Sequence, residues 1–385
     1  MTRLLEISFG ALLAISTVCA PWIAEAADPV RIATTDRTAW PYGMGSVKAF
    51  NLASRAEILA LANVWAANDT QRDAEDWAGR LSIKEADPVS IERWRDQIRP
   101  VWTENFEKAS MSCQTGADLF CPPARLPTWA EIVAFARRNW ASLPKPLRPW
   151  AAEQRRFYEA YLYEQLRLAA LFPNITSEVL AHDDSEILGR GYPDGSFLLT
   201  FDDGPTAVSG PTDQMIALLR QRHVSALFFL LGDRLQLRLA ASDPAAIRAL
   251  YEVMCVASHG EAHRPHPKME NWKQSIDSAN AALSTILPSG QTRVKYFRPP
   301  YGQRTREISR YIVSLHQRDM LWNIDSQDWN PGITSGQVIG RTVTLMLLWR
   351  RGILLFHDGH PVARKAIPVI LAATKKTGIH WMGCR

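Results

Sequence analysis

The feature that most restricts the fold is a regular alternation of short apolar runs with amphipathic segments in the C-terminal half of the chain. Apolar runs bounded by turn residues predict strands, and apolar residues spaced three and four apart predict helices. We expect strands at 196–201, 226–231, 253–257, 294–297, 320–324, 353–356 and 379–382, and helices at 212–222, 272–287, 304–315, 336–348 and 362–374. Strands that alternate with helices form parallel sheets, and a sheet of this many units readily closes into a barrel. The prediction for this half is therefore an α/β barrel.

The N-terminal half has helical spacing instead. From about residue 48 to residue 172, apolar side chains recur at intervals of three and four. Residues 40–150 contain eight tryptophans, which could form a sugar-stacking surface, but their spacing among other apolar residues favours packing in a core. A chain of 385 residues with 46% hydrophobic composition is long enough for two cores. We expect a mainly α-helical region of unknown role at 27–190 and a second domain at 191–385.

The first 26 residues resemble a signal peptide. Arg3 precedes an apolar run at 7–20, and Ala24 and Ala26 are small residues of the kind that signal peptidase requires. The run is shorter than the roughly 20 residues that span a bilayer, so an uncleaved anchor is the weaker interpretation. We expect an exported protein, periplasmic or secreted, without stable membrane insertion after the signal is removed.

Charge and cysteine content exclude some functions. The formal net charge is +5, and no dense run of lysine or arginine indicates nucleic-acid binding. Four cysteines follow the expected signal peptide, and an even number in an exported protein predicts two disulfides. The short gap between Cys113 and Cys121 favours that pair, which leaves Cys255 for Cys384, although four cysteines allow three pairings. No CxxC spacing is present, which disfavours a cysteine zinc site.

Residues whose side chains can bind a metal ion or transfer a proton follow most of the predicted strands. The carboxyl ends of the strands of an α/β barrel open on one face, so residues far apart in sequence converge there. The first strand is followed by two adjacent acids, which repel each other unless a cation lies nearby. The residues at the strand ends are Asp202 and Asp203 after the first strand, His259 and His263 after the third, Arg298 after the fourth, Asp325 after the fifth and His357 after the sixth. This pattern predicts an active site.

Two histidines and one carboxylate form a ligand set that leaves positions open for water and substrate. We expect Asp203, His259 and His263 to bind one divalent metal ion, with zinc as the default. Iron oxygenases use the same ligand set, but the second acid and the later histidine favour hydrolysis. The sequence HisGlyGluAlaHis differs from the zinc-protease motif, because Gly260 stands where that motif has glutamate.

The remaining strand-end residues suit proton transfer. Asp202 would act as the general base toward water, and Arg298 would pair with this carboxylate, orient it and keep its pKa low enough for it to stay ionised. His357 would act as the general acid toward the leaving group. Asp325 would hold the ring of His357 and keep it protonated. His266 and His360 lie close enough in sequence to support these groups.

Five motifs in order resemble those of the NodB-homology polysaccharide deacetylases, carbohydrate esterase family 4. They are TFDDGP at 200–205, SHGEAH at 258–263, RPPYG at 298–302, DSQDW at 325–329 and LLFH at 354–357. The resemblance covers about residues 195–381. It implies a distorted (β/α) barrel that removes acetyl groups from N-acetylglucosamine polymers, or less often from xylan. The implied partner is a polysaccharide of the cell envelope, and the implied product is acetate.

The resemblance also implies residue roles. It implies that Asp202 is the general base and His357 the general acid. It also implies that Asp203, His259 and His263 bind the metal ion. It adds the backbone amide of Tyr301 as an oxyanion donor, with Trp329 and Leu355 lining the groove for the acetyl methyl group. Arg298 would orient the base and Asp325 would tune the acid.

Two features depart from the family pattern. The family usually has serine or threonine where this chain has Gly260, and the helical half has no counterpart in the family core. Glycine at this position is more typical of hydrolases of cyclic amides and ureides. A hydrolase of that kind, or a non-catalytic glycan-binding barrel, remains the alternative function.

Overall fold

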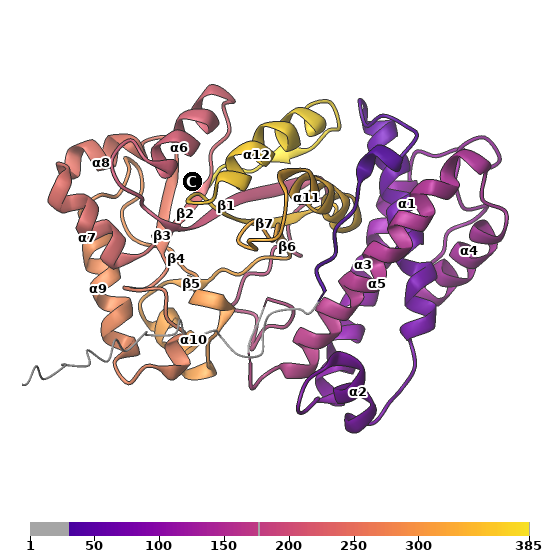
Figure 1. Ribbon diagram of the computed structural model, residues 1–385, viewed down its shortest axis with the longest axis horizontal. Helices are drawn as coiled ribbons and strands as arrows, with labels where there is room; N and C mark the ends of the chain where they lie inside the picture. The colour runs from indigo at the N-terminus through magenta and orange to yellow at the C-terminus, as the bar shows by residue number, and fades with distance from the viewer. Residues whose placement is uncertain (1–30, 176–177, 385) are drawn as a thin grey trace, which may run out of the picture.

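The computed structural model describes residues 31–175 and 178–384, in which a helical region packs beside a barrel of parallel strands (Figure 1). The predicted signal peptide lies outside these residues. Among the helices described, none is both long and apolar enough to span a bilayer.

The helical region consists of five α-helices and two short 3₁₀ helices whose starts follow ordinary capping rules. Asp87 caps α3 ahead of Pro88, and Thr128 forms a capping box with Glu131 at the start of α4. The elements are η1 (Arg37–Ala39), α1 (Val47–Asn68), α2 (Ala74–Leu81), α3 (Pro88–Ser110), α4 (Trp129–Ala141), η2 (Lys145–Leu147) and α5 (Arg148–Leu171). The predicted helical character of this region is confirmed.

The tryptophans of the helical region form its core. Seven of the eight between residues 40 and 150 are buried, and Trp140 is partly buried against the same cluster. Trp102 is at the centre, with ring centroids 5.4 to 6.1 Å from those of Trp65, Trp94, Trp129 and Trp349. The expectation of core packing is confirmed, and the last of these contacts joins this core to a helix of the barrel.

The C-terminal half forms the predicted parallel sheet. Its strands are β1 (Ser196–Gly204), β2 (Leu227–Leu230), β3 (Cys255–Ser258), β4 (Tyr296–Phe297), β5 (Arg318–Asp319), β6 (Ile324–Asp325), β7 (Gly352–His357) and β8 (His380–Trp381). They pair in the order β5-β4-β3-β2-β1-β7-β6, with β8 added to β1, and every pairing is parallel.

Helices surround the sheet on its outer side (Figure 1). They are α6 (Pro211–Gln221), α7 (Gly232–Ala241), α8 (Pro244–Leu250), α9 (Trp272–Ser284), α10 (Arg306–Ser314), α11 (Ser335–Trp349) and α12 (Pro361–Thr374), with 3₁₀ turns η3 (His266–Lys268) and η4 (Pro300–Gly302). The five predicted helices are present, whereas α7 and α8 were not anticipated.

The predicted strand at 320–324 is wrong. The chain pairs with β4 through β5 and with β7 through β6, while residues 320–323 between them lie outside any strand. Residues 318–319 pair with one strand and residues 324–325 pair with another. The residues between them therefore make no regular strand hydrogen bonds. Met320 instead forms an isolated parallel bridge with Ile187. Residues 318–325 therefore connect the two edge strands of the path, β5 and β6, through the chain, and the described sheet is a distorted, incompletely closed barrel.

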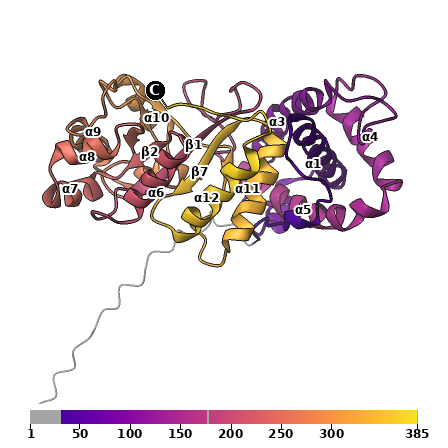
Figure 2. The same ribbon diagram turned by 90° about the horizontal axis from the view of Figure 1, so that it is seen from above.

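Helix α11 lies between the barrel and the helical region (Figure 2). The last carbonyl groups of a helix lack partners within it. Here the Asn105 side chain of α3 donates to the carbonyl oxygens of Leu348 and Trp349 at 3.0 and 2.9 Å, and Ser54 of α1 donates to that of Leu347 at 2.7 Å. The helical region thus completes the hydrogen bonding of a barrel helix.

Both predicted disulfides are present. Cys113 pairs with Cys121 within the helical region, and Cys255 of β3 pairs with Cys384. The second bridge connects the end of the chain to the sheet.

Candidate active site

The two adjacent acids of β1 lie at a β-bulge. Successive side chains of a strand normally point to opposite faces of the sheet. The pairing of β1 with β2 shifts register between Asp202 and Gly204, and Asp203 has a positive φ of 74°. The bulge brings both carboxylates to His259: its Nε2 lies 3.8 Å from an Asp202 oxygen and 3.4 Å from an Asp203 oxygen. Backbone strain of this kind is characteristic of functional sites.

Asp203, His259 and His263 converge as a set of potential metal ligands. Their ligand atoms lie within 4.8 Å of one another, and Nε2 of His263 lies 3.6 Å from Asp203 Oδ1. That oxygen is buried and has no hydrogen-bond partner among the described residues. A hydrogen bond of 2.7 Å joins Nδ1 of His259 to the Arg298 carbonyl oxygen, and burial lowers the pKa of His259 to about 3. Nδ1 is therefore the protonated nitrogen of a neutral ring, and Nε2 is free to bind a cation, so the residues fit a metal ion.

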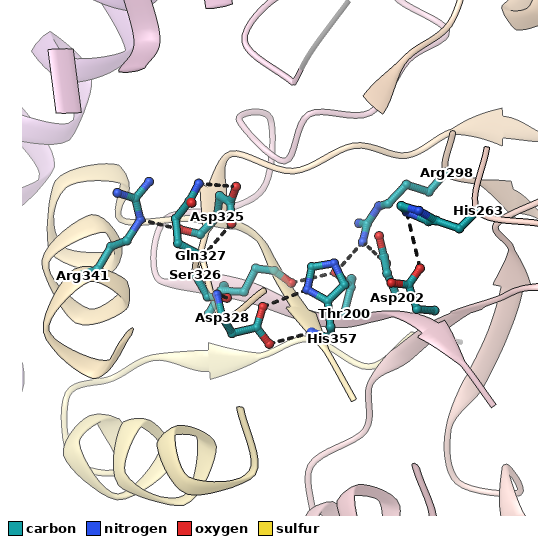
Figure 3. A network of polar contacts seen from close by, with 12 residues as sticks. Thr200, Asp202, His263, Arg298, Asp325, Ser326, Gln327, Asp328, Arg341 and His357 are labelled. Atoms are coloured by element: carbon teal, nitrogen blue, oxygen red, sulfur yellow. Dashed lines mark hydrogen bonds and ion pairs between the residues drawn. The ribbon is translucent and has the colours of Figure 1, made fainter. Parts of the chain in front are cut away.

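Arg298 holds Asp202 from behind the site, as expected. Its guanidinium is completely buried and donates to Asp202 at 2.7 Å, to Thr200 Oγ1 at 2.9 Å and to two backbone carbonyls (Figure 3). Arg298 lowers the pKa of Asp202, which is the predicted direction, but burial is the larger effect, so this pKa lies above its usual value. A raised pKa makes the carboxylate a stronger base.

His357 ends β7 directly beside Asp202. The two residues are register partners across the pairing of β1 with β7. Both Nδ1 and the backbone N–H of His357 lie 2.8 Å from oxygens of Asp328 (Figure 3). Burial lowers the pKa of His357, but Asp328, Asp203 and Asp202 outweigh burial and raise it to about 10. The ring is therefore protonated at neutral pH.

The carboxylate that holds His357 is Asp328, whereas the sequence predicted Asp325. Asp325 instead accepts hydrogen bonds from the backbone N–H and the side-chain amide of Gln327, at 2.8 and 2.9 Å. Gln327 has a φ of 60°, so the chain turns sharply after β6 and directs Asp328 back toward β7. The only signal in the sequence was the second acid of DSQDW, and choosing between the two acids required the shape of this turn.

One cavity of about 400 Å³ contains these groups. Every predicted site residue lines it except Arg298, which lies behind Asp202. Tyr301, Trp329 and Leu355 are part of the lining, and the Tyr301 ring lies 4.3 Å from that of His263, between centroids. The helical region also contributes to the lining, which the sequence did not indicate. Its residues are Tyr161, Glu164, Gln165, Arg167 and Leu168 of α5.

The structure explains why glycine occupies position 260. Its φ is +81°, and a Cβ atom there would lie 2.6 Å from Cε1 of His266. His266 is completely buried and hydrogen-bonds Ser275 Oγ at 3.2 Å, while the Ser275 hydroxyl also accepts from the Glu261 backbone. His266 thus supports the loop between the two metal-ligand candidates. His360 lies 5.6 Å from His357, between ring centroids, and precedes α12.

Comparison with known proteins supports the same interpretation. Residues 189–319 match the family model for polysaccharide deacetylase. A bifunctional xylanase/xylan deacetylase of Cellvibrio japonicus is 30% identical over 162 residues, which cover 42% of this chain and 22% of that protein. Chitin deacetylase 1 of Saccharomyces cerevisiae is 26% identical over 184 residues, 46% of this chain and 56% of that protein. The chain thus spans less than two thirds of the length of these relatives.

A solved structure is similar to part of this chain. A family 4 carbohydrate esterase from Streptomyces lividans aligns with a TM-score of 0.40 and 25% identity, over 49% of this chain and 91% of that one. The family model falls on the barrel. The barrel of this chain is therefore similar to the polysaccharide deacetylases, in agreement with the five sequence motifs.

Proposed function

We propose that this protein is a metal-dependent hydrolase that removes N-acetyl groups from a polysaccharide containing N-acetylglucosamine. The observation that carries the proposal is the content of one cavity. It combines a convergent set of potential metal ligands, a buried carboxylate held by an arginine, and a histidine protonated through a second carboxylate. These are the parts that hydrolysis of an unactivated amide needs.

Asp203, His259 and His263 would hold one divalent cation, for which zinc is the first candidate because it accepts nitrogen and oxygen ligands together. When bound, the ion supplies Lewis acidity, which activates water and polarises a carbonyl oxygen.

The residues of the chain supply the proton transfers. Asp202, with its raised pKa, accepts a proton from the attacking water, and Arg298 keeps its carboxylate oriented toward the cavity. His357 carries a proton at neutral pH and donates it to the leaving nitrogen as the C–N bond breaks. Asp328 holds the ring of His357 in position. Water and the acetamide are thereby converted to acetate and an amine.

The acetyl group has a place in the same cavity. Leu355 and Trp329 line it next to the catalytic strands and offer apolar surface to the acetyl methyl group. We further propose that the barrel domain comprises residues 191–385, that residues 27–190 form the helical region, and that the protein acts outside the cytoplasm. The two disulfides support an oxidising compartment.

Neither alternative function is favoured by a specific observation. Gly260, the feature that suggested a cyclic amide or ureide substrate, is explained by its contact with His266. A non-catalytic glycan-binding barrel would have no need for a complete base, ligand set and acid.

The experiment that tests the proposal is acetate release. Purified protein is incubated with peptidoglycan, chitooligosaccharide or a β-1,6-linked glucosamine polymer, each with and without chelator, and Asp202→Asn serves as the control for contaminating enzymes. We expect release from at least one substrate, loss with chelator and recovery on adding a divalent metal. No acetate from any of the three, with metal present, would refute the proposed function.

A further inference from the structure

Helix α5 of the helical region forms a wall of the catalytic cavity. Five residues from its C-terminal half line the cavity together with Asp202, Asp203 and His357 of the barrel. Residues of the segment that follows, Glu178 and Val179, line it as well. The helical region is therefore part of the site itself.

This wall is fixed to the strands that carry the catalytic groups. Glu164 of α5 accepts two hydrogen bonds from Arg341 of α11, at 3.0 and 2.8 Å. Arg341 also donates through Nε to the carbonyl oxygen of Asp325 in β6, at 2.8 Å (Figure 3). A second bond joins Trp349 Nε1 to the Tyr161 hydroxyl at 3.0 Å. Because these groups are buried, α5 keeps a defined position relative to the cavity.

Gln165 follows Glu164 directly, but its side chain makes no hydrogen bond to α11 or to any other described residue. Its side chain is 7% exposed and lines the cavity, yet its amide makes no side-chain hydrogen bond to any residue in the described part of the chain. The Gln165 amide atoms are not among the fully buried side-chain atoms without a partner, so they remain accessible from the cavity. The amide of Gln165 is therefore available to a ligand in the cavity.

Glu178 provides a second polar group, whose carboxyl group hydrogen-bonds its own backbone N–H but no other side chain among the described residues. It lines the same cavity, and burial, together with Asp325, raises the pKa of its carboxyl group to about 7. An amide and a carboxyl group both donate or accept hydrogen bonds as hydroxyl groups require. Trp322 and Trp329 add flat apolar surface to the lining. Polar groups beside aromatic faces match the two kinds of surface that a sugar ring presents.

We propose that Gln165 and Glu178 bind the hydroxyl groups of a sugar ring of the substrate, so that the helical region determines which glycan is accepted. The inference rests on the proposed deacetylase function. It adds substrate-binding residues from a region outside the family model, which ends at residue 319 and begins at residue 189.

The test compares binding and kinetics of Gln165→Ala with those of the unaltered protein, using chitotetraose as the probe. Loss of one hydrogen bond predicts a roughly three- to tenfold higher Kd by isothermal titration calorimetry and a similar rise in KM. The expected change in kcat is smaller than that in KM. Gln97→Ala, an exposed glutamine of α3, is the matched control and keeps the original Kd.

A second variant separates binding from folding. Gln165→Glu has nearly the same shape but lacks the amide donor, and it should also raise Kd. Glu178→Gln tests the second group in the same way. Unchanged Kd and KM in both Gln165 variants, with melting temperatures equal to that of the unaltered protein, would overturn the inference. Failure of the unaltered protein to release acetate would refute the proposed function instead. The calorimetric comparison of Kd values would still test whether Gln165 of α5 binds the glycan.

Discussion

Replacing Asp328 with asparagine tests whether this residue, and not Asp325, controls the general acid. Asp328 lies 2.8 Å from both Nδ1 and the backbone N–H of His357, and its charge is the strongest of those that raise the His357 pKa to about 10. One adjacent opposite charge shifts a pKa by about 1–3 units. We therefore expect the His357 pKa of the variant to fall to between about 7 and 9.

The sign of the effect follows from the role of the group. A general acid must carry its proton, so turnover falls as pH rises through its pKa. If that pKa falls by about 2 units, to about 8, turnover at pH 9 decreases about tenfold relative to the unaltered protein. Near pH 6 the His357 ring is protonated in both proteins. Any decrease in the turnover of the variant at that pH therefore reflects a change in the orientation of the ring.

The assay is kcat for acetate release between pH 5 and pH 10.5, with metal in excess. Asp325→Asn is the matched control, because it makes the same change of charge three residues earlier, at the end of β6, in a carboxylate that accepts hydrogen bonds from Gln327. A lowered alkaline pKa in Asp325→Asn, together with an unchanged one in Asp328→Asn, would refute the assignment.

Three further predictions concern the base, the ligands and the loop between them. Asp202→Asn should lower turnover by a factor of about 10² to 10⁴, the usual contribution of a general base, and near-normal turnover would remove Asp202 from the mechanism. His259→Ala should lose bound metal in elemental analysis, because it removes a nitrogen of the only three-residue ligand set found among the described residues; full metal content would contradict the ligand assignment. Gly260→Ala should destabilise the protein by about 1–3 kcal/mol, since the new Cβ at a φ of +81° would lie 2.6 Å from His266. Thermal unfolding measures this loss, and Gly79→Ala, where a Cβ meets nothing within 4 Å, should show no loss.

Much of the barrel was predictable because its signals are local. Each strand is a short apolar run bounded by turn residues, and the carboxyl ends of parallel strands meet on one face whatever the details of packing. That rule was sufficient to bring Asp202, His259 and His357 together. The segment at 318–325 was assigned incorrectly because its two ends pair with different strands, and no property of those residues alone shows this.

The pKa of the base also depended on the tertiary structure. The sequence indicates that Arg298 can pair with Asp202, and the pair forms. Whether the carboxylate becomes more or less acidic depends on a balance between that charge and burial, and complete burial outweighs the arginine. Burial is a property of the assembled barrel.

The sequence by itself determined the parallel barrel and predicted which side chains gather at the carboxyl ends of its strands, because both follow from residue type along and after the strands. Only the tertiary structure decided that Asp328 holds His357 and that α5 forms a wall of the cavity. The first depends on a turn at Gln327 with positive φ, and the second on the packing of the helical region against α11. Both arise from contacts between residues distant in the chain or from backbone angles that neighbouring residues do not specify.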